Sequence, residues 1–196
     1  STGMPLPNEI EQTVKLIKKY KTPLAITHCI SAYPCPYEIM NLDFISELSK
    51  KYKIPVGLSD HTPSIYNALG AVSLGASIIE KHFTFNKKLS GPDHKSSIDS
   101  DELRILVDGA KANYLARGKI KKIFSQEKEI VKWARESVVS IRNIKKGEKL
   151  NLNNISTKRP SPKKGQIPAN KFKYQLGKKL NRDIKKDTIL KFKFLK

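Results

Sequence analysis

Residues 57–93 read GLSDHTPSIYNALGAVSLGASIIEKHFTFNKKLSGPD, and this stretch decides the fold. Two short apolar runs, 54–58 and 76–80, each end in a polar cluster that carries a histidine, and a helix-like segment lies between them. A strand, a helix and a second strand joined by short connections indicate a right-handed βαβ unit with parallel strands.

The same alternation extends outward from this unit. The apolar run 23–28 has no polar alternation, as expected of a strand buried on both faces of a parallel sheet. Apolar residues recur at helical spacing in the first helix, for which Asn8 is the expected N-cap. The sequence therefore predicts an α/β fold with helices at 8–20, 41–52, 62–74 and 99–115 and strands at 23–28, 54–58 and 76–80.

Charge divides the chain. Residues 1–118 carry 14 Lys and Arg against 12 Asp and Glu, whereas residues 119–196 carry 24 against 6, so nearly all of the net charge of +20 lies in the second part. We expect a first domain over 1–118, a basic linker with some helical character over 119–137, and a β-rich, turn-dense domain over 138–196. Short β-rich runs at 137–141 and 188–190 are the strands expected there.

The bulk composition excludes several classes of protein. Cys29 and Cys35 are the only cysteines, the first residues show no charged segment followed by an apolar one, and no apolar run approaches the roughly 20 residues that cross a bilayer. We therefore expect a reduced, cytoplasmic protein without a membrane span. Residues 1–4 resemble the end of a strand, which suggests a piece of a longer chain.

His61 and His82 occupy equivalent positions after consecutive predicted strands. Neighbouring strands of a sheet lie roughly 4.8 Å apart, so the two imidazoles could share one divalent cation. Two nitrogen ligands with oxygen or water at the remaining positions suit manganese, iron, cobalt or zinc. Alternatively, each is a hydrogen-bonded histidine without a metal.

Carboxylates accompany both histidines. Glu80 precedes His82 by two residues and so points to the same face of the strand. It could orient an imidazole, bind a substrate hydroxyl or form a salt bridge to a lysine. The turn 90–93 could present Asp93 over the same edge of the sheet, and Ser59 lies directly before the Asp60-His61 pair.

The strand at 23–28 also ends in polar residues. His28, Ser31 and Tyr33 suit a phosphate or carboxylate ligand, although capping of the loop by hydrogen bonds is the more frequent role of such residues. Cys29 and Cys35 are spaced too widely for a Cys-x-x-Cys redox motif, and we interpret both as bystanders.

The basic second part has the charge expected of a nucleic-acid or anionic-polymer binding module. Its lysines, however, occur as scattered pairs in turns without interleaved aromatic residues, which favours a solvated surface and makes a nucleic-acid partner the less favoured alternative. Arg159 differs, because a proline follows it in a short loop, and it is a candidate for a defined contact with a carbonyl or carboxylate.

Several motifs together resemble those of bacterial sialic acid synthases, the family of the N-acetylneuraminate, legionaminate and pseudaminate synthases. The resemblance covers essentially the whole chain, and the combination of LSDHT, EKHFT and GPDHK is specific. The motifs are STGM at 1–4, HC at 28–29 with YP at 33–34, GLSDHT at 57–62, EKHFT at 80–84, GPDHK at 91–95 and KRP at 158–160.

The resemblance implies the carboxy-terminal part of a TIM (β/α)8 barrel, followed by a small SAF domain similar to type III antifreeze proteins. It implies a transferase that condenses phosphoenolpyruvate (PEP) with an N-acylated hexosamine of the mannosamine type. The products are a nine-carbon 2-keto acid and phosphate. The family is also expected to use a divalent metal, typically Mn²⁺ with Mg²⁺ or Co²⁺ as alternatives, as a Lewis acid on the sugar aldehyde.

Functional residues follow from the resemblance position by position. His61 and His82 match the metal ligands, while Glu80 and Asp93 match catalytic carboxylates near the metal and the sugar hydroxyls. Arg159 resembles a SAF-domain arginine that binds the sugar's N-acyl group in the partner subunit's barrel, which implies a domain-swapped homodimer. The positions that match the PEP site are Ser1, Ser31, Tyr33 and Ser59.

Two departures accompany the matches. Residues 1–118 supply only three strands and the end of a fourth, whereas a full barrel has eight, so the lysines that grip PEP and a further catalytic glutamate would lie elsewhere and this chain alone is expected to be inactive. The loop KRPSPKKG is also longer than the Arg-Pro-Gly loop of relatives, so Arg159 departs from the family pattern in its loop length.

Overall fold

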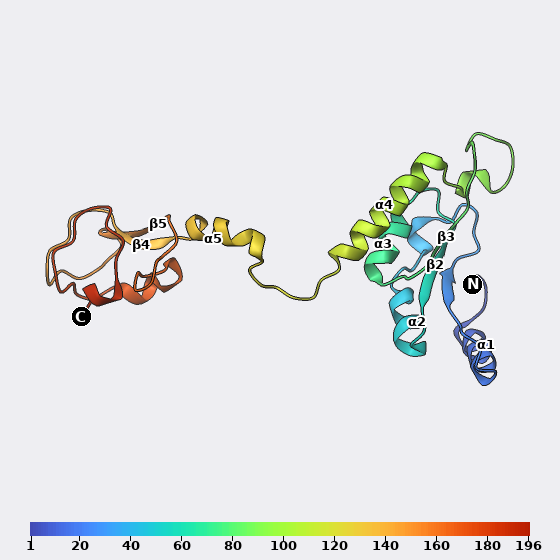
Figure 1. Ribbon diagram of the computed structural model, residues 1–196, viewed down its shortest axis with the longest axis horizontal. Helices are drawn as coiled ribbons and strands as arrows, with labels where there is room; N and C mark the ends of the chain where they lie inside the picture. Colours follow the sequence, from blue (N-terminus) through green and yellow to red (C-terminus); the bar gives the residue numbers. More distant parts are fainter. The chain divides into compact units, whose positions relative to one another are not determined.

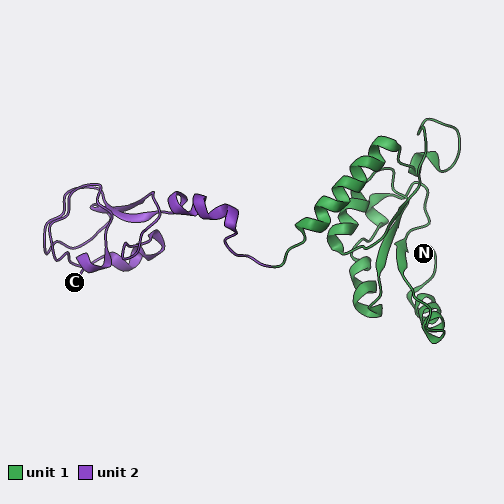
Figure 2. Ribbon diagram, in the orientation of Figure 1, with its two compact units in different colours: residues 1–119 green, residues 120–196 purple.

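A computed structural model describes residues 1–196, which divide into two compact units, residues 1–119 and 120–196 (Figure 2). The first unit contains a three-stranded parallel sheet in the order β1-β2-β3 and four α-helices (Figure 1). The α/β class with parallel strands is thus observed. The elements are β1 (Ile26–Cys29), β2 (Val56–Asp60), β3 (Ile79–Lys81), α1 (Pro7–Lys19), α2 (Phe44–Tyr52), α3 (Tyr66–Leu74) and α4 (Ser100–Ala116).

The sheet is extended beyond β1 by the first residues of the chain. Thr2 forms an isolated parallel bridge with His28, and both its backbone N–H and its hydroxyl donate to the Thr27 carbonyl at 2.9 Å. The end of a strand expected at residues 1–4 is therefore hydrogen-bonded alongside β1. This contact holds Ser1 and Gly3 near the carboxyl end of the sheet.

The strands begin and end later than predicted. β2 runs to Asp60 and β3 to Lys81, whereas the apolar runs suggested 54–58 and 76–80. Pro55 has no N–H to donate, so only its carbonyl joins the sheet, accepting from Ile26 N–H at 3.1 Å, and the paired strand begins at Val56. The later ends bring the polar residues before each histidine into the paired part of the sheet.

Helix starts also differ from prediction, and α2 begins at Phe44 rather than at residue 41, where Asn41 has a positive φ of 48°. The first helix begins at Pro7 with Leu6 as N-cap rather than Asn8, because proline is favoured at the first helical position, and the Glu9 carboxylate accepts a hydrogen bond from Leu6 N–H at 2.6 Å. The third helix begins only at Tyr66, since Pro63 and the turn that follows His61 occupy the expected first residues.

Close approach of β2 to the segment before β3 depends on Gly57. A Cβ atom at this position would lie 2.4 Å from the Ile78 carbonyl oxygen, well inside any real contact distance. Helices α2 and α3 pack against β2, and the fully buried Leu58 lies in the core between sheet and helices.

The second unit is built mostly from turns. It contains α5 (Lys128–Ala134) within the expected linker, and an antiparallel pair of β4 (Ser137–Ser140) with β5 (Ile155–Lys158). The strand expected at 188–190 is reduced to a single bridge between Ile189 and Val139.

An internal repeat closes the second unit. Ile144 and Ile184 exchange two backbone hydrogen bonds of 2.8 Å, and the neighbouring side chains of Asn143 and Asp183 each accept from the opposite backbone. The segments RNIKKG and RDIKKD are thus structurally equivalent. Their isoleucines and other buried aliphatic residues form a separate hydrophobic core. None of the helices in either unit combines the length and the apolar character needed to span a membrane.

Candidate active site

The carboxyl edge of the parallel sheet gathers the polar residues singled out in the sequence. Ser59 pairs with Glu80 and Asp60 pairs with Lys81 in the register of β2 and β3, so His61 and His82 follow at equivalent positions. Because carboxyl ends of parallel strands share one edge, the two histidines come from adjacent elements and face the same space.

A cavity of about 400 Å³ lies at this edge. It brings together seven of the nine predicted site residues, together with Cys29, which we had interpreted as a bystander. Its lining consists of Ser1, Gly3, Met4, Pro5, Cys29, Ser31, Tyr33, Ser59, His61, Glu80 and His82.

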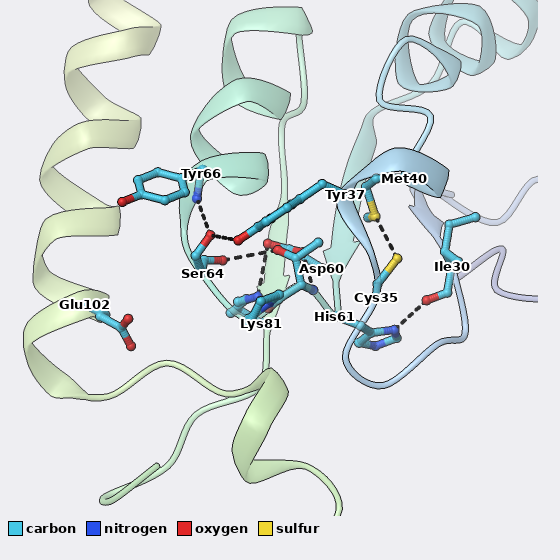
Figure 3. Close-up of polar contacts among 12 residues, drawn as sticks. Ile30, Cys35, Tyr37, Met40, Asp60, His61, Ser64, Tyr66, Lys81 and Glu102 are labelled. Atoms are coloured by element: carbon cyan, nitrogen blue, oxygen red, sulfur yellow. Dashed lines mark hydrogen bonds and ion pairs between the residues drawn. The ribbon is translucent and has the colours of Figure 1, made fainter. Parts of the chain in front are cut away.

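His61 is buried and oriented by the main chain. Its Nδ1 lies 2.8 Å from the Ile30 carbonyl oxygen, and its own carbonyl accepts a hydrogen bond from Cys35 N–H at 2.9 Å (Figure 3). Since a carbonyl oxygen only accepts, Nδ1 carries a proton, and in the neutral ring the lone pair is therefore on Nε2. This is the arrangement in which a histidine is ready to bind a cation through Nε2.

Three aromatic rings meet in the cavity. The rings of His61 and His82 lie 5.2 Å apart between centroids and are inclined by 65°, while Tyr33 lies 4.1 Å from His61 and 5.7 Å from His82. Tyr33 thus covers one side of the histidine pair. Its hydroxyl-bearing ring is half exposed and faces the same cavity.

Glu80 is held by Ser59. The Ser59 hydroxyl donates to Glu80 Oε1 at 2.9 Å across the two strands. The carboxylate therefore has a hydroxyl partner, and the alternative of a salt bridge to a lysine is not what the structure contains. One Glu80 oxygen remains for a ligand in the cavity.

Asp93 lies beside the cavity rather than in its wall. Its Oδ2 is 3.9 Å from His82 Nδ1, so an ion pair forms only when His82 is protonated. Two imidazoles and the carboxylates of Glu80 and Asp93 thus lie in or beside the cavity, but no group of three or more His, Cys, Asp or Glu side chains is close enough to hold a metal ion by itself.

Arg159 belongs to the second unit and follows β5. Its guanidinium lies 5.3 Å from the centre of the Trp133 ring, a cation–π contact. The loop is further tied to the unit by the Ser137 hydroxyl, which donates to the Pro160 carbonyl at 2.8 Å, and by Ser161, which accepts from Arg135 N–H at 3.0 Å. Trp133 was not among the predicted site residues, because no motif or spacing in the sequence connects it to Arg159.

A buried ion pair was also missed. Lys81 Nζ lies 3.1 Å from Asp60 Oδ2, and the side chains are only 3% and 0% exposed. Burial lowers the pKa of Lys81 below its ordinary value, and the Asp60 carboxylate opposes that shift. The signal available in the sequence was that each charged residue directly precedes one of the two histidines.

A larger cavity of about 790 Å³ lies between α1 and α2, behind β1. His28 points toward this side, where its Nε2 contacts the Met40 carbonyl at 2.7 Å and its ring packs against Phe44. His28 therefore separates from Ser31 and Tyr33, with which we had grouped it. The larger cavity has a mostly apolar wall and is lined by none of the residues predicted to bind metal, PEP or sugar.

The fold and this cavity define an α/β protein with a histidine pair at the carboxyl edge of a parallel sheet. The model of the NeuB family matches residues 1–122, and that of the SAF domain matches residues 135–196. The chain therefore belongs to the NeuB family and carries a SAF domain, as the motifs indicated.

Characterised proteins and a solved structure are similar to the chain. The N,N'-diacetyllegionaminic acid synthase of Campylobacter jejuni is 37% identical over 97% of this chain and 58% of its own length, and a pseudaminic acid synthase of that species is 38% identical over 97% and 55%. The crystal structure of the N-acetylneuraminic acid synthetase of Leptospira borgpetersenii is 38% identical, with a TM-score of 0.60 over 66% of this chain and 46% of that one. The chain thus spans about half the length of the curated relatives it matches.

Proposed function

We propose that this chain is part of an enzyme that condenses PEP with an N-acylated mannosamine-type sugar to give a nine-carbon 2-keto sugar acid and phosphate. The observation that carries the proposal is the single cavity lined by Ser1, Ser31, Tyr33, Ser59, His61, Glu80 and His82. Membership of the NeuB family, and relatives named as synthases of this class of acids, support the same reaction type.

We further infer that the first unit is the carboxy-terminal part of a TIM barrel. The order β1-β2-β3 and the parallel bridge of Thr2 to His28 are what four consecutive barrel strands would present. In that arrangement the residues that line the cavity form one wall of the active site. The other strands of the barrel would supply the opposite wall.

His61 and His82 are the proposed ligands of a divalent cation, most simply Mn²⁺. The Nδ1–H of His61 is already committed to the Ile30 carbonyl, and the two rings are close enough to serve one ion. Because this chain offers two imidazoles and no third ligand at bonding distance, positions stay open for water or for a substrate oxygen. When bound, the ion supplies Lewis-acid polarisation of the sugar aldehyde.

The side chains around the histidines would orient the two substrates. Ser31 and Tyr33 present hydroxyl groups toward the cavity, which suits the phosphate and carboxylate of PEP, whereas Ser59 lies beside them with its hydroxyl donating to Glu80. Glu80, held by Ser59, presents a carboxylate that can accept a proton from a hydroxyl or from water. Asp93 lies at the rim, where it can bind a sugar hydroxyl.

The proposed reaction balances without an oxidant or reductant. The enol carbon of PEP forms a bond to the aldehyde carbon, and the aldehyde oxygen takes up a proton. Water adds to the cationic C2 and loses a proton, for which Glu80 is the positioned base, and cleavage of the C–O bond then releases phosphate and leaves the 2-keto group.

Arg159 is proposed to bind the N-acyl group of the sugar in the partner subunit's site, which requires a domain-swapped homodimer. The support lies in the SAF domain match and in the anchored Arg159 loop. Sedimentation of the intact protein as a dimer, together with loss of sugar affinity in Arg159→Ala, is the expected result.

The relatives named as legionaminic and pseudaminic acid synthases favour a di-N-acetylated hexosamine as the alternative sugar. The test is to incubate the intact protein with PEP and Mn²⁺ and, in turn, N-acetylmannosamine or a di-N-acetylated 6-deoxyhexose, and to determine the product mass. We expect a nine-carbon keto acid from one of them, and no product from any N-acylated hexosamine would contradict the proposed reaction.

A further inference from the structure

The ends of β2 and β3 are joined by a charge pair on the side of the sheet opposite the cavity. Asp60 and Lys81 are register partners, and Lys81 Nζ lies 3.1 Å from Asp60 Oδ2 (Figure 3). Alternation along each strand places them away from Ser59 and Glu80, which line the cavity. Neither Asp60 nor Lys81 lines the cavity.

An ion pair buried this deeply is not explained by stability alone. Removing two charges from water is costly, and a well-packed apolar pair of similar volume is often as stable or more so. The remaining polar contacts of the two side chains therefore indicate what the charges accomplish in this fold.

Those contacts converge on the residue after His61. Asp60 Oδ1 accepts a hydrogen bond from Thr62 N–H at 2.8 Å, and Lys81 Nζ donates to the Thr62 carbonyl. The two bonds hold both peptide groups of Thr62, and so fix the chain that leaves His61. Cys35 N–H, which donates to the His61 carbonyl, completes this support from the neighbouring loop.

The same pair also reaches the second histidine. Lys81 directly precedes His82, so its side chain connects the backbone that bears one imidazole to the loop that bears the other. The 5.2 Å separation of the two rings depends on these strand ends staying in register.

We propose that Asp60 and Lys81 are positioning residues that hold His61 in register with His82 for binding one divalent cation. This inference rests on the proposed function, because it assumes that the histidine pair binds metal. The competing role is that the pair only stabilises the fold.

A double variant separates the two roles. Lys81→Met alone leaves an unpaired buried carboxylate and is expected to unfold the protein, which says nothing about positioning. Asp60→Leu/Lys81→Met removes both charges, keeps apolar packing and abolishes both hydrogen bonds to Thr62. Asp60→Asn/Lys81→Met retains an amide acceptor for Thr62 N–H and is expected to recover part of the lost function.

The experiment uses the intact protein freed of metal by a chelator. Mn²⁺ affinity is measured by titration calorimetry, thermal unfolding is recorded without metal, and the imidazole ¹⁵N signals are recorded on the metal-free protein. We expect the apolar double variant to unfold near the wild-type temperature but to bind Mn²⁺ about 10–100-fold more weakly, as for loss of other groups that orient ligands. The His61 signals should move, while those of His28 and His94 stay in place.

The matched control is the exposed pair Glu11 and Lys51, whose side chains lie 2.8 Å apart between α1 and α2. Glu11→Gln/Lys51→Met should leave both Mn²⁺ affinity and the His61 signals unchanged. If the apolar double variant at positions 60 and 81 also binds Mn²⁺ like the wild type and leaves the His61 signals in place, the positioning role is wrong and the proposed metal site stands. If the wild type binds no Mn²⁺ while the His61 signals still move in the variant, the pair orients His61 but the proposed metal site is wrong.

Discussion

The ring centres of His61 and His82 lie 5.2 Å apart, and Tyr33 packs against both rings. This relationship follows from strand register, because Asp60 and Lys81 are paired and the histidines come next along each strand. The donated Nδ1–H of His61 leaves its Nε2 as the atom available to a ligand.

Glu80→Gln tests the acid–base role of the carboxylate beside the histidines. The amide keeps the hydrogen bond from Ser59 but cannot accept a proton, so kcat of the intact protein should fall about 10²–10⁴-fold. Mn²⁺ affinity measured by calorimetry should remain within a few-fold of the wild type. Glu47→Gln, on the exposed surface of α2, is the control and should have no effect on kcat.

Arg159 and Trp133 should act as a unit in sugar binding. Trp133→Ala removes the aromatic face that lies 5.3 Å from the guanidinium, a contact of about 0.5–1 kcal/mol at an exposed site. KM for the sugar should rise in Trp133→Ala and more strongly in Arg159→Ala, with KM for PEP unchanged. The double variant should resemble Arg159→Ala, and simple additivity of the two effects would show that the residues are not coupled.

Gly57→Ala should destabilise the first unit by about 1–3 kcal/mol, since a Cβ would lie 2.4 Å from the Ile78 carbonyl oxygen and the strands must separate. Gly70 is the matched control within the same unit. It lies inside α3, where a Cβ meets only Leu42 Cδ1 at 3.4 Å, so Gly70→Ala should stabilise by about 0.5–1 kcal/mol. Urea unfolding measures the change in the free energy of unfolding for each variant. The same change in both variants would contradict the close contact at Gly57.

Glu11 should titrate unusually low. Hydrogen bonds from Lys15, then from Lys51, together with the charges of both lysines, lower the pKa of this carboxyl from 4.5 to about 2. A lowered pKa in the folded state means that its contribution to stability is present above about pH 4.5 and is lost as the pH falls toward 2. The pKa of Glu11 is measured by following the ¹³C chemical shift of its carboxyl group as the pH is changed. Because the group is exposed, high salt should return the pKa toward 4.5, and a salt-independent value would contradict this origin.

The sequence was sufficient for the features that depend on periodicity. Alternating strands and helices predicted the parallel sheet, and the polar residues at the strand ends predicted which side chains would share one edge. His61, His82, Ser59 and Glu80 indeed line one cavity. The identity of a ligand there stays a prediction.

Features that depend on tertiary packing were not predictable. The positions of Asp60 and Lys81 directly before the two histidines were visible in the sequence, but their almost complete burial as an ion pair depends on how the helices cover that face of the sheet. The contact of Trp133 with Arg159 depends on where α5 packs, and helix starts depended on local turns around Pro7 and Pro63.

The central claim is that the histidine pair serves a metal-dependent condensation, and phosphate release from PEP tests it most directly. The intact protein should release phosphate only when an N-acylated hexosamine and a divalent metal such as Mn²⁺ are both present, and His61→Ala should abolish the release while the protein stays folded. Sugar-dependent phosphate release that persists after complete removal of metal, or that survives in His61→Ala, would contradict the account.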